Sequence, residues 1–425
     1  MITSRRALLS LAALAAIVSI ATGCTVGVPS AGSATPSMTP TPTPTSSAPS
    51  SVEADAIMQI VEDYMDEAHL RAVILRVSVD GEDVVRDAVG ESITGVPATV
   101  DMHFRNGAVA ISYMSTLMLQ LVDEGRMGLD DRVSEYLPDL PHADEVTVQQ
   151  LAQMTSGYHD YVLGNDEFVQ IAYADPYKMW TTEEQLALAV DDPLWFEPGT
   201  NWAYAHTNYV ILGLVLEEVT GMPLQDALQE KVLDPLGLDE TTPSLTGAIP
   251  EPALHAFTSE RRGYFALPAD ARFYEESTYW NPSWTIAQGA IQTSTIDDVH
   301  DSAIAIGTGA LLSDESYERM TSTDLRGRTT AIEGCVNCRP LDEFATYGLG
   351  LWITGDWYLQ NPLFSGYAAV NAYLPTEKVA IAVAVTYEED AFEADGGYPN
   401  GGDELFRRIG AYLAPDDAPP VRPAP

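Results

Sequence analysis

Residues 368–387 read AAVNAYLPTEKVAIAVAVTY, and this stretch decides the expected fold. Its two halves, 368–374 and 379–387, are rich in Val, Ile, Ala and Tyr, which are residues that favour strands. The Pro375-Thr376-Glu377 segment between them is a turn signal. The sequence therefore predicts a β-hairpin near the C-terminal end of the chain.

The N-terminal part of the folded region predicts strands as well. Residues 52–70 carry apolar side chains at helical spacing, and residues 72–79 and 83–89 form a second predicted hairpin around Gly81. Residues 401–413 predict an amphipathic helix. Because strands occur at both ends, we expect an α+β fold. In it, an antiparallel sheet from both termini is flanked by helices, and a helical subdomain occupies the middle.

Helix-end signals mark four helices in the middle of the chain, over 112–124, 147–154, 207–220 and 224–233. Glycine follows the first and third of these segments, and glycine is typical of a helix C-terminus. A threonine starts the second, where it can cap the free backbone N–H groups.

The composition excludes several classes of partner. The chain has 425 residues, with 21 Lys and Arg against 62 Asp and Glu, so its formal net charge is −41. Such an excess repels phosphate groups, which argues against nucleic acid and against docking on anionic lipid headgroups. Its lysines are Lys178, Lys231 and Lys378.

Residues 1–24 predict an export signal. Arg5 and Arg6 precede an apolar run over 7–21 that is too short for a permanent membrane span. The small residues before Cys24 resemble a bacterial lipobox, which implies lipidation of that cysteine; residues 4–9 also resemble a twin-arginine signal. We expect a lipoprotein anchored to the outer face of the cytoplasmic membrane.

Two segments are too polar or too rich in proline to fold. Residues 25–51 carry no charge and consist mostly of Ser, Thr and Pro, which predicts an extended linker. Residues 414–425 carry several prolines and predict a disordered tail. The folded domain is therefore expected over 52–413.

Cys335 and Cys338 form a Cys-x-x-Cys pair. A zinc site needs further ligands at suitable spacing, and the sequence has no second pair of this kind. In an exported protein a local disulfide is the favoured interpretation.

A series of short motifs gives the chain a recognisable family pattern. They are Phe104-Arg105-Asn106-Gly107, Leu129-Asp130-Asp131, Thr155-Ser156-Gly157, Thr207-Asn208-Tyr209 and Tyr347-Gly348-Leu349-Gly350. Over residues 52–413 the chain resembles the penicillin-recognising serine hydrolases, the group of class C β-lactamases and D-alanyl-D-alanine carboxypeptidases. The resemblance implies acyl transfer without a cofactor, by a serine with a lysine one helical turn later.

The residues at the motif positions depart from that pattern. The family's Ser-x-x-Lys falls on Ala108 and Ile111, and no lysine of the chain has a serine three positions before it. The family's Tyr-x-Asn falls on Tyr204 and His206, and its third motif falls on Gln360-Asn361-Pro362. The resemblance therefore implies that no catalytic motif is intact.

Our first hypothesis is a pseudoenzyme that keeps a ligand pocket lined by Ala108, Tyr204, His206, Trp202 and Trp284. Its partner would be a peptidoglycan stem peptide or an envelope protein.

A second hypothesis is an active serine hydrolase of β-lactamase, carboxypeptidase or esterase type, with Ser112 or Ser115 as a non-standard nucleophile and Tyr204 with His206 as the base. A third, a metal-dependent hydrolase, lacks support because the seven histidines form no His-x-His or His-x-x-x-His pair. No metal is expected.

Overall fold

The computed structural model describes residues 51–268 and 271–422. The predicted export signal, Cys24 and linker residues 25–50 lie outside the described residues. Ser51, assigned to the linker from the sequence, is the first residue of helix α1. Within the described ranges, no helix combines the length and the apolar character that a membrane crossing needs.

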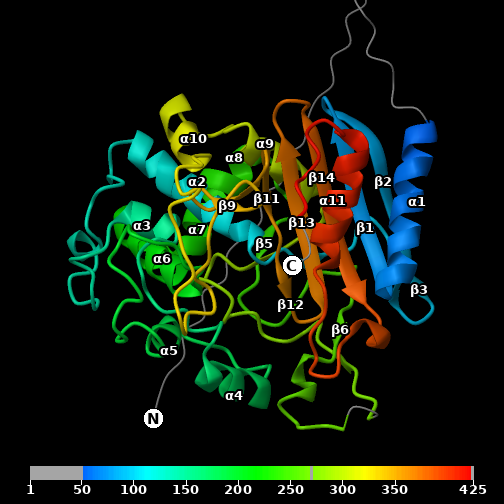
Figure 1. The fold of residues 1–425 in the computed structure, drawn as a ribbon, viewed down its shortest axis with the longest axis horizontal. Helices are drawn as coiled ribbons and strands as arrows, with labels where there is room; N and C mark the ends of the chain where they lie inside the picture. Colours follow the sequence, from blue (N-terminus) through cyan, green and yellow to red (C-terminus); the bar gives the residue numbers. More distant parts are fainter. Residues whose placement is uncertain (1–50, 269–270, 423–425) are drawn as a thin grey trace, which may run out of the picture. The chain divides into compact units, whose positions relative to one another are not determined.

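One antiparallel sheet joins the two ends of the described chain (Figure 1). Its strands, in spatial order, are β3 (Val96–Pro97), β2 (Glu82–Ile93), β1 (Leu70–Val79), β14 (Val379–Tyr387), β13 (Tyr367–Leu374), β11 (Trp357–Gln360), β10 (Trp352–Thr354) and β9 (Thr346–Tyr347). The short strand β12 (Leu363–Phe364) pairs with β13. At the centre, β1 pairs with β14, with Val73 opposite Val385. The predicted sheet from both termini is therefore confirmed.

Alternation along β14 assigns its two faces to different layers. Ile381 and Val383 pack against α1 (Ser51–Ala68) and α11 (Gly401–Leu413), which lie on the same side of the sheet (Figure 1). Ala382 and Ala384 face the opposite side, where α9 (Ile296–Gly307) packs. Side chains point alternately to the two faces of a strand, and small alanines let a helix approach closely.

The remaining helices form the predicted helical subdomain. They are α2 (Val109–Asp123), α3 (Val148–Ala152), α4 (Asp166–Ala174), α5 (Thr182–Leu186), α6 (His206–Thr220), α7 (Leu224–Leu228), α8 (Asp234–Leu236) and α10 (Asp314–Met320). Helix α6 ends at Gly221 in the left-handed conformation, as the glycine signal predicts. The predicted helix over 224–233 is α7 followed by a π-helical turn, Gln229–Leu233.

Two short sheets lie outside the main sheet. Strand β4 (Phe104–Arg105) pairs with β8 (Gln292–Ser294), which also pairs with β5 (Thr242–Pro243). A second pair joins β6 (Phe257–Thr258) to β7 (Glu275–Glu276). The first of these sheets connects two segments of the middle region to β4, which precedes α2.

The predicted disordered tail is wrong for residues 414–422. Ala414 is fully buried in the core beside α11. The indole N–H of Trp357 donates to the Asp417 carbonyl at 2.8 Å, and Arg407 donates to the Pro420 carbonyl at 3.0 Å. Proline prevents regular hydrogen bonding along the chain, but it does not prevent a segment from packing on a finished core.

Candidate functional site

A cavity of about 280 Å³ lies where the start of α2, the segment before α6 and the β11–β12 connection meet. Its lining includes residues at these three places, Gly107, Ala108, Tyr204, His206, Gln360, Asn361, Pro362 and Phe364, and also Trp284 and Trp352 from elsewhere in the chain. The structure therefore brings together the three motif positions that the resemblance assigns, Ala108, Tyr204 and Gln360-Asn361-Pro362.

Position 107 requires glycine because the β11–β12 connection packs directly against it. Gly107 has φ +51°, and a Cβ there would lie 2.6 Å from Cβ of Pro362 and 2.7 Å from Cε1 of Phe364. Ala108 follows and immediately precedes α2. Its methyl group lines the cavity, and its backbone N–H has no hydrogen-bond partner in the described part of the chain.

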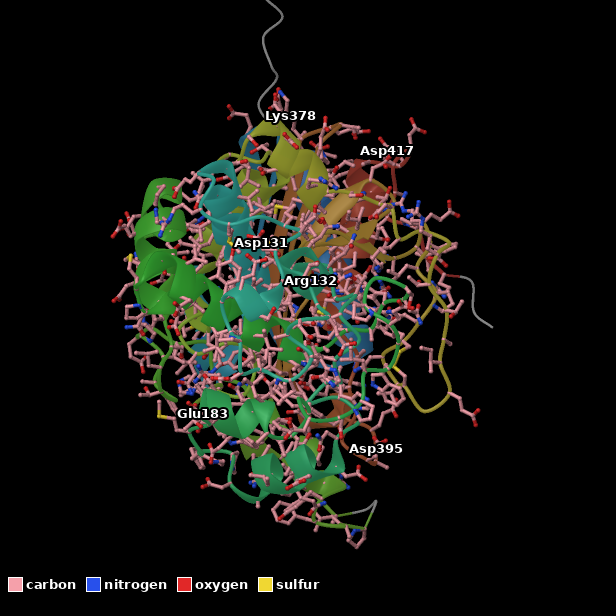
Figure 2. The ribbon with its side chains drawn as sticks, turned by 90° about the vertical axis from the view of Figure 1, so that its left-hand side faces the viewer. Asp131, Arg132, Glu183, Lys378, Asp395 and Asp417 are labelled. Carbon is pink, nitrogen blue, oxygen red and sulfur yellow. A yellow bond between two sulfur atoms is a disulfide. The ribbon has the colours of Figure 1, made fainter. Side chains whose placement is uncertain are left out.

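The described residues that line the cavity beside Ala108 carry no ammonium group. Ile111 is 1% exposed and belongs to the core that surrounds α2. Lys178 and Lys231 pair with Glu184 and Glu124, and Lys378 lies at the far end of the sheet, paired with Asp80 (Figure 2). Among the described residues that line the cavity, none is a lysine or an arginine.

Tyr204 keeps its position in the cavity wall but is poorly suited to act as a base. Burial, helped by nearby Tyr347 and Asp160, raises the pKa of Tyr204 well above its ordinary value. The phenol therefore stays protonated at neutral pH, where it can donate a hydrogen bond but is a poor base, because deprotonation of a buried tyrosine is costly.

His206 has a partner that the sequence analysis missed. Its Nδ1 lies 3.0 Å from both carboxylate oxygens of Asp160, whose side chain is 1% exposed. Asp160 also accepts the backbone N–H groups of Val162 at 3.0 Å and of His206 itself at 3.2 Å. These two residues are 46 positions apart, and no spacing rule links them.

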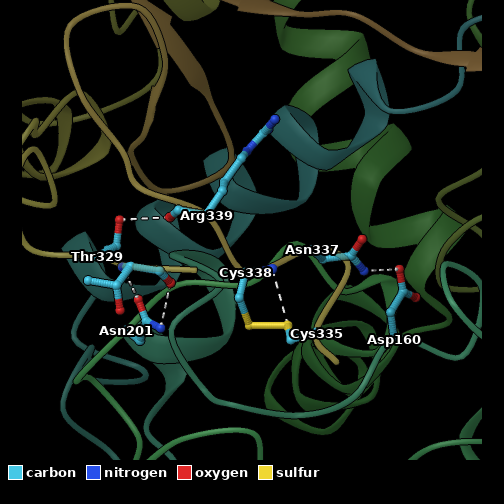
Figure 3. The surroundings of a disulfide bond; sticks show 8 residues. Asp160, Asn201, Thr329, Cys335, Asn337, Cys338 and Arg339 are labelled. Atoms are coloured by element: carbon cyan, nitrogen blue, oxygen red, sulfur yellow. Dashed lines mark hydrogen bonds between the residues drawn. A yellow bond between two sulfur atoms is a disulfide. The ribbon is translucent and has the colours of Figure 1, made fainter. Parts of the chain in front are cut away.

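A disulfide loop supports this pair (Figure 3). Cys335 and Cys338 are joined, as the sequence predicts, with sulfurs 2.06 Å apart. Between them, Asn337 directs its amide toward the Asp160 carboxylate, with Nδ2 to Oδ2 at 3.4 Å. Cys338 forms an antiparallel bridge with Ala203. The loop therefore lies against the segment that carries Tyr204 and His206.

The prediction that Trp202 lines the pocket is wrong. Trp202 is 0% exposed and packs against Trp352, with ring centroids 5.3 Å apart. Trp352 covers Trp202 and forms the cavity wall in its place. Trp284 does line the cavity, and Gln360 does too, although its amide donates to the Gly350 carbonyl at 2.7 Å.

Ser112 and Ser115 do not reach the cavity. Both are fully buried. Ser112 donates to the Gly350 carbonyl at 2.8 Å, and Ser115 hydrogen-bonds to the Tyr209 hydroxyl at 2.8 Å. Since a nucleophile must reach the substrate, the hypothesis of a relocated serine at either position is contradicted.

The described residues also contain no group of three His, Cys, Asp or Glu side chains placed to hold a metal ion.

A second cavity, of about 290 Å³, lies beside the first. The two share the wall residues Val162, Leu163, Trp284, Leu363 and Phe364. The second cavity is also lined by other aromatic rings and by Glu260. Burial raises the pKa of Glu260 above its ordinary value. Its aromatic lining suits an apolar ligand or an apolar part of one.

Comparison with known proteins identifies the family. The family model described as Beta-lactamase matches residues 57–403, so the chain belongs to the β-lactamase family. It is a β-lactamase-like serine hydrolase domain with Ala108 where the resemblance places the family's serine.

Two curated relatives are similar to parts of this chain. The chain is 34% identical over 194 residues to Penicillin-binding protein 4 of Amycolatopsis lactamdurans, covering 44% of this chain and 47% of that one. It is 29% identical over 191 residues to Esterase EstB of Burkholderia gladioli, covering 42% and 48%. The chain thus spans about half the length of these two relatives.

Among solved structures, a D-stereospecific amidohydrolase from Streptomyces sp. superposes with a TM-score of 0.63 at 25% identity, covering 78% of this chain and 94% of that one. A D-amino acid amidase from Ochrobactrum anthropi SV3 superposes with a TM-score of 0.70 at 21% identity, covering 86% and 99%. The likeness to the amidase shows the fold alone.

Proposed function

We propose that this chain is a non-acylating member of the β-lactamase family, which binds a carbonyl-containing ligand in the cavity without forming an acyl-enzyme. The observation that carries the proposal is the methyl group of Ala108 in the cavity wall. A methyl group cannot attack a carbonyl carbon, and the buried side chain of Ile111 cannot accept a proton.

The lining of the cavity supports binding. The N–H of Ala108 stands free at the start of α2, where the helix dipole also favours a partial negative charge such as that of a carbonyl oxygen. Tyr204 supplies a protonated hydroxyl. Trp284 and Trp352 supply flat apolar surfaces of the kind that line small-molecule sites.

The same lining residues restrict the chemical class of the ligand. A free carboxylate is usually held by an arginine or a lysine, and none of the described lining residues is either. We therefore propose that the ligand presents an amide or ester carbonyl from within its chain. An internal segment of a peptidoglycan stem peptide fits this description, and a peptide segment of an envelope protein is the other partner class.

We further propose that the protein is exported and held by a lipid on Cys24 at the outer face of the cytoplasmic membrane. The support is the sequence of residues 1–24 alone. Metabolic labelling with an alkyne fatty acid tests it. Label is expected on the wild-type chain and not on Cys24→Ala, and an unlabelled wild-type chain contradicts the proposal.

Intact-mass spectrometry tests the absence of an acyl-enzyme. The purified domain is incubated with a fluorescent penicillin and with a fluorophosphonate, alongside a serine-containing penicillin-binding protein as positive control. We expect no mass increase on this chain. A stable adduct with the mass of the opened antibiotic contradicts the proposal.

Calorimetry with muropeptide fragments tests binding. Gly107→Ala is the matched variant, because its Cβ would displace Pro362 and Phe364 from the cavity wall. We expect binding to the wild-type domain and at least tenfold weaker binding to Gly107→Ala. Absence of heat with every fragment and with amidated fragments contradicts a peptidoglycan ligand.

A further inference from the structure

We infer that the His206–Asp160 pair is a general base, and that the cavity hydrolyses activated esters by direct attack of a water molecule. This goes beyond the proposed function, because it adds a reaction to the binding site. It rests on the proposed function only in that no acyl-enzyme is formed.

The contact with Asp160 decides which nitrogen of His206 carries the proton. A carboxylate only accepts hydrogen bonds, so the Nδ1 atom that lies 3.0 Å from both oxygens must be the N–H. In the neutral imidazole the lone pair is then on Nε2. The pair thus holds His206 in the tautomer that a general base requires.

Asp160 is fixed well enough to hold that orientation. It is buried and accepts backbone N–H groups from two sides, from Val162 and from His206. The amide of Asn337 approaches it from the disulfide loop (Figure 3). A carboxylate with this many donors keeps its position when the neighbouring imidazole gains a proton, and it stabilises the resulting cation. Asp160 therefore acts as a positioning residue.

The other ring nitrogen of His206, Nε2, is accessible. The His206 side chain is 14% exposed, and its ring belongs to the cavity lining. Within the described ranges, Nε2 has no hydrogen-bond partner, and it is not among the buried polar atoms that lack one. A free, accessible Nε2 in the wall of a cavity is available to a water molecule.

Two other groups of the cavity lining can hydrogen-bond to the carbonyl oxygen. The Ala108 N–H has no partner among the described residues, and the Tyr204 hydroxyl remains protonated. Both belong to the same lining as His206. Because residue 108 ends at its methyl group, a water molecule can occupy the space that a larger side chain would fill.

The reaction balances without any further reactant. His206 Nε2 takes a proton from water as the water oxygen bonds to the ester carbonyl carbon, whose oxygen receives hydrogen bonds from the Ala108 N–H and the Tyr204 hydroxyl. The carbon–oxygen bond to the alcohol then breaks, and the imidazolium returns its proton to the leaving oxygen. The products are one carboxylic acid and one alcohol.

The test is turnover of 4-nitrophenyl acetate by the intact domain. We expect wild-type turnover above the buffer rate. His206→Asn is expected to lower kcat about 100-fold or more, the usual contribution of a general base. His255→Asn is the matched control, because His255 also pairs through Nδ1 with a carboxylate, that of Glu276 at 2.7 Å, outside the cavity lining.

The variant Asp160→Asn distinguishes a role of Asp160 in orienting His206 from a role in folding stability alone. It is expected to lower kcat with little change in KM and to alter the pH profile, since the amide can hold the wrong tautomer. A purely structural role for Asp160 would leave the pH profile of the folded fraction unchanged. If Asp160→Asn does not fold, His206→Asn and His206→Gln decide the question, with melting curves as the check on folding.

The two proposals fail in different ways. Equal turnover by wild type, His206→Asn and His255→Asn, or none by wild type, overturns the general base and leaves the non-acylating site intact. An acetyl adduct on the protein during turnover, seen by intact mass, overturns the non-acylating site. Turnover lost in His206→Asn, with no adduct at any time, supports both.

Discussion

Arg105 is expected to be the most sensitive charged residue of the fold. Its side chain is 2% exposed. It donates to the Ser244 hydroxyl at 2.8 Å, to the Gly247 carbonyl at 2.8 Å, and to the Thr278 and Trp280 carbonyls at 3.2 Å each. The guanidinium of Arg105, on β4, therefore holds together two segments that are distant in sequence. One of them contains Trp280, which lines the second cavity.

The cost of removing the guanidinium follows from these four contacts. Burial lowers the pKa of Arg105 to about 10, so the group is still charged at neutral pH. Arg105→Met removes the donor from three backbone carbonyls, and a buried polar group left unpaired costs about 1–3 kcal/mol. Part of this cost is offset, because the variant no longer has to bury a charged group. We expect the free energy of unfolding to fall by about 3–5 kcal/mol.

Urea titration and scanning calorimetry measure the loss. A fall of this size corresponds to a drop in Tm of roughly 5–15 °C. The free energy of unfolding of Arg105→Lys is expected to lie between those of wild type and Arg105→Met, because one ammonium group cannot reach acceptors on both segments. Arg328→Met is the control, because Arg328 is exposed, and it is expected to stay within about 0.5 kcal/mol of wild type. The reasoning is refuted if Arg105→Met is as stable as Arg328→Met.

Two further predictions concern Glu260 and the C-terminal segment. Because burial raises the pKa of Glu260, the folded state binds that proton more tightly than the unfolded state, and stability is lost as pH rises above the ordinary value of 4.5. Glu260→Gln should therefore gain stability relative to wild type as pH rises above about 4.5, as measured by urea titration; a difference that is independent of pH contradicts this. Deleting residues 414–425 should lower the free energy of unfolding by about 2–4 kcal/mol, because the Trp357 indole loses its acceptor and the core loses Ala414. An unchanged unfolding midpoint would show that the segment adds nothing to the fold.

Local patterns were enough to predict the sheet and the altered motifs. Strand composition at 368–387 predicted β13 and β14, and the strand pattern near the N-terminus predicted β1, which pairs with β14. The altered motif positions 108 and 111 can be identified from the sequence without a structure, because a motif is defined by residue identity and spacing alone. The same holds for the Cys335–Cys338 pair, which needs only a short turn to close.

What required the tertiary structure was every contact between distant side chains. The partner of His206 lies 46 positions away, Trp352 rather than Trp202 forms the cavity wall, and residues 414–422 pack although their composition resembles a disordered tail. Periodicity and propensity report how a segment folds against its own neighbours in sequence. Which segments then meet depends on the path of the intervening loops, and that path is set by the packing of the whole core.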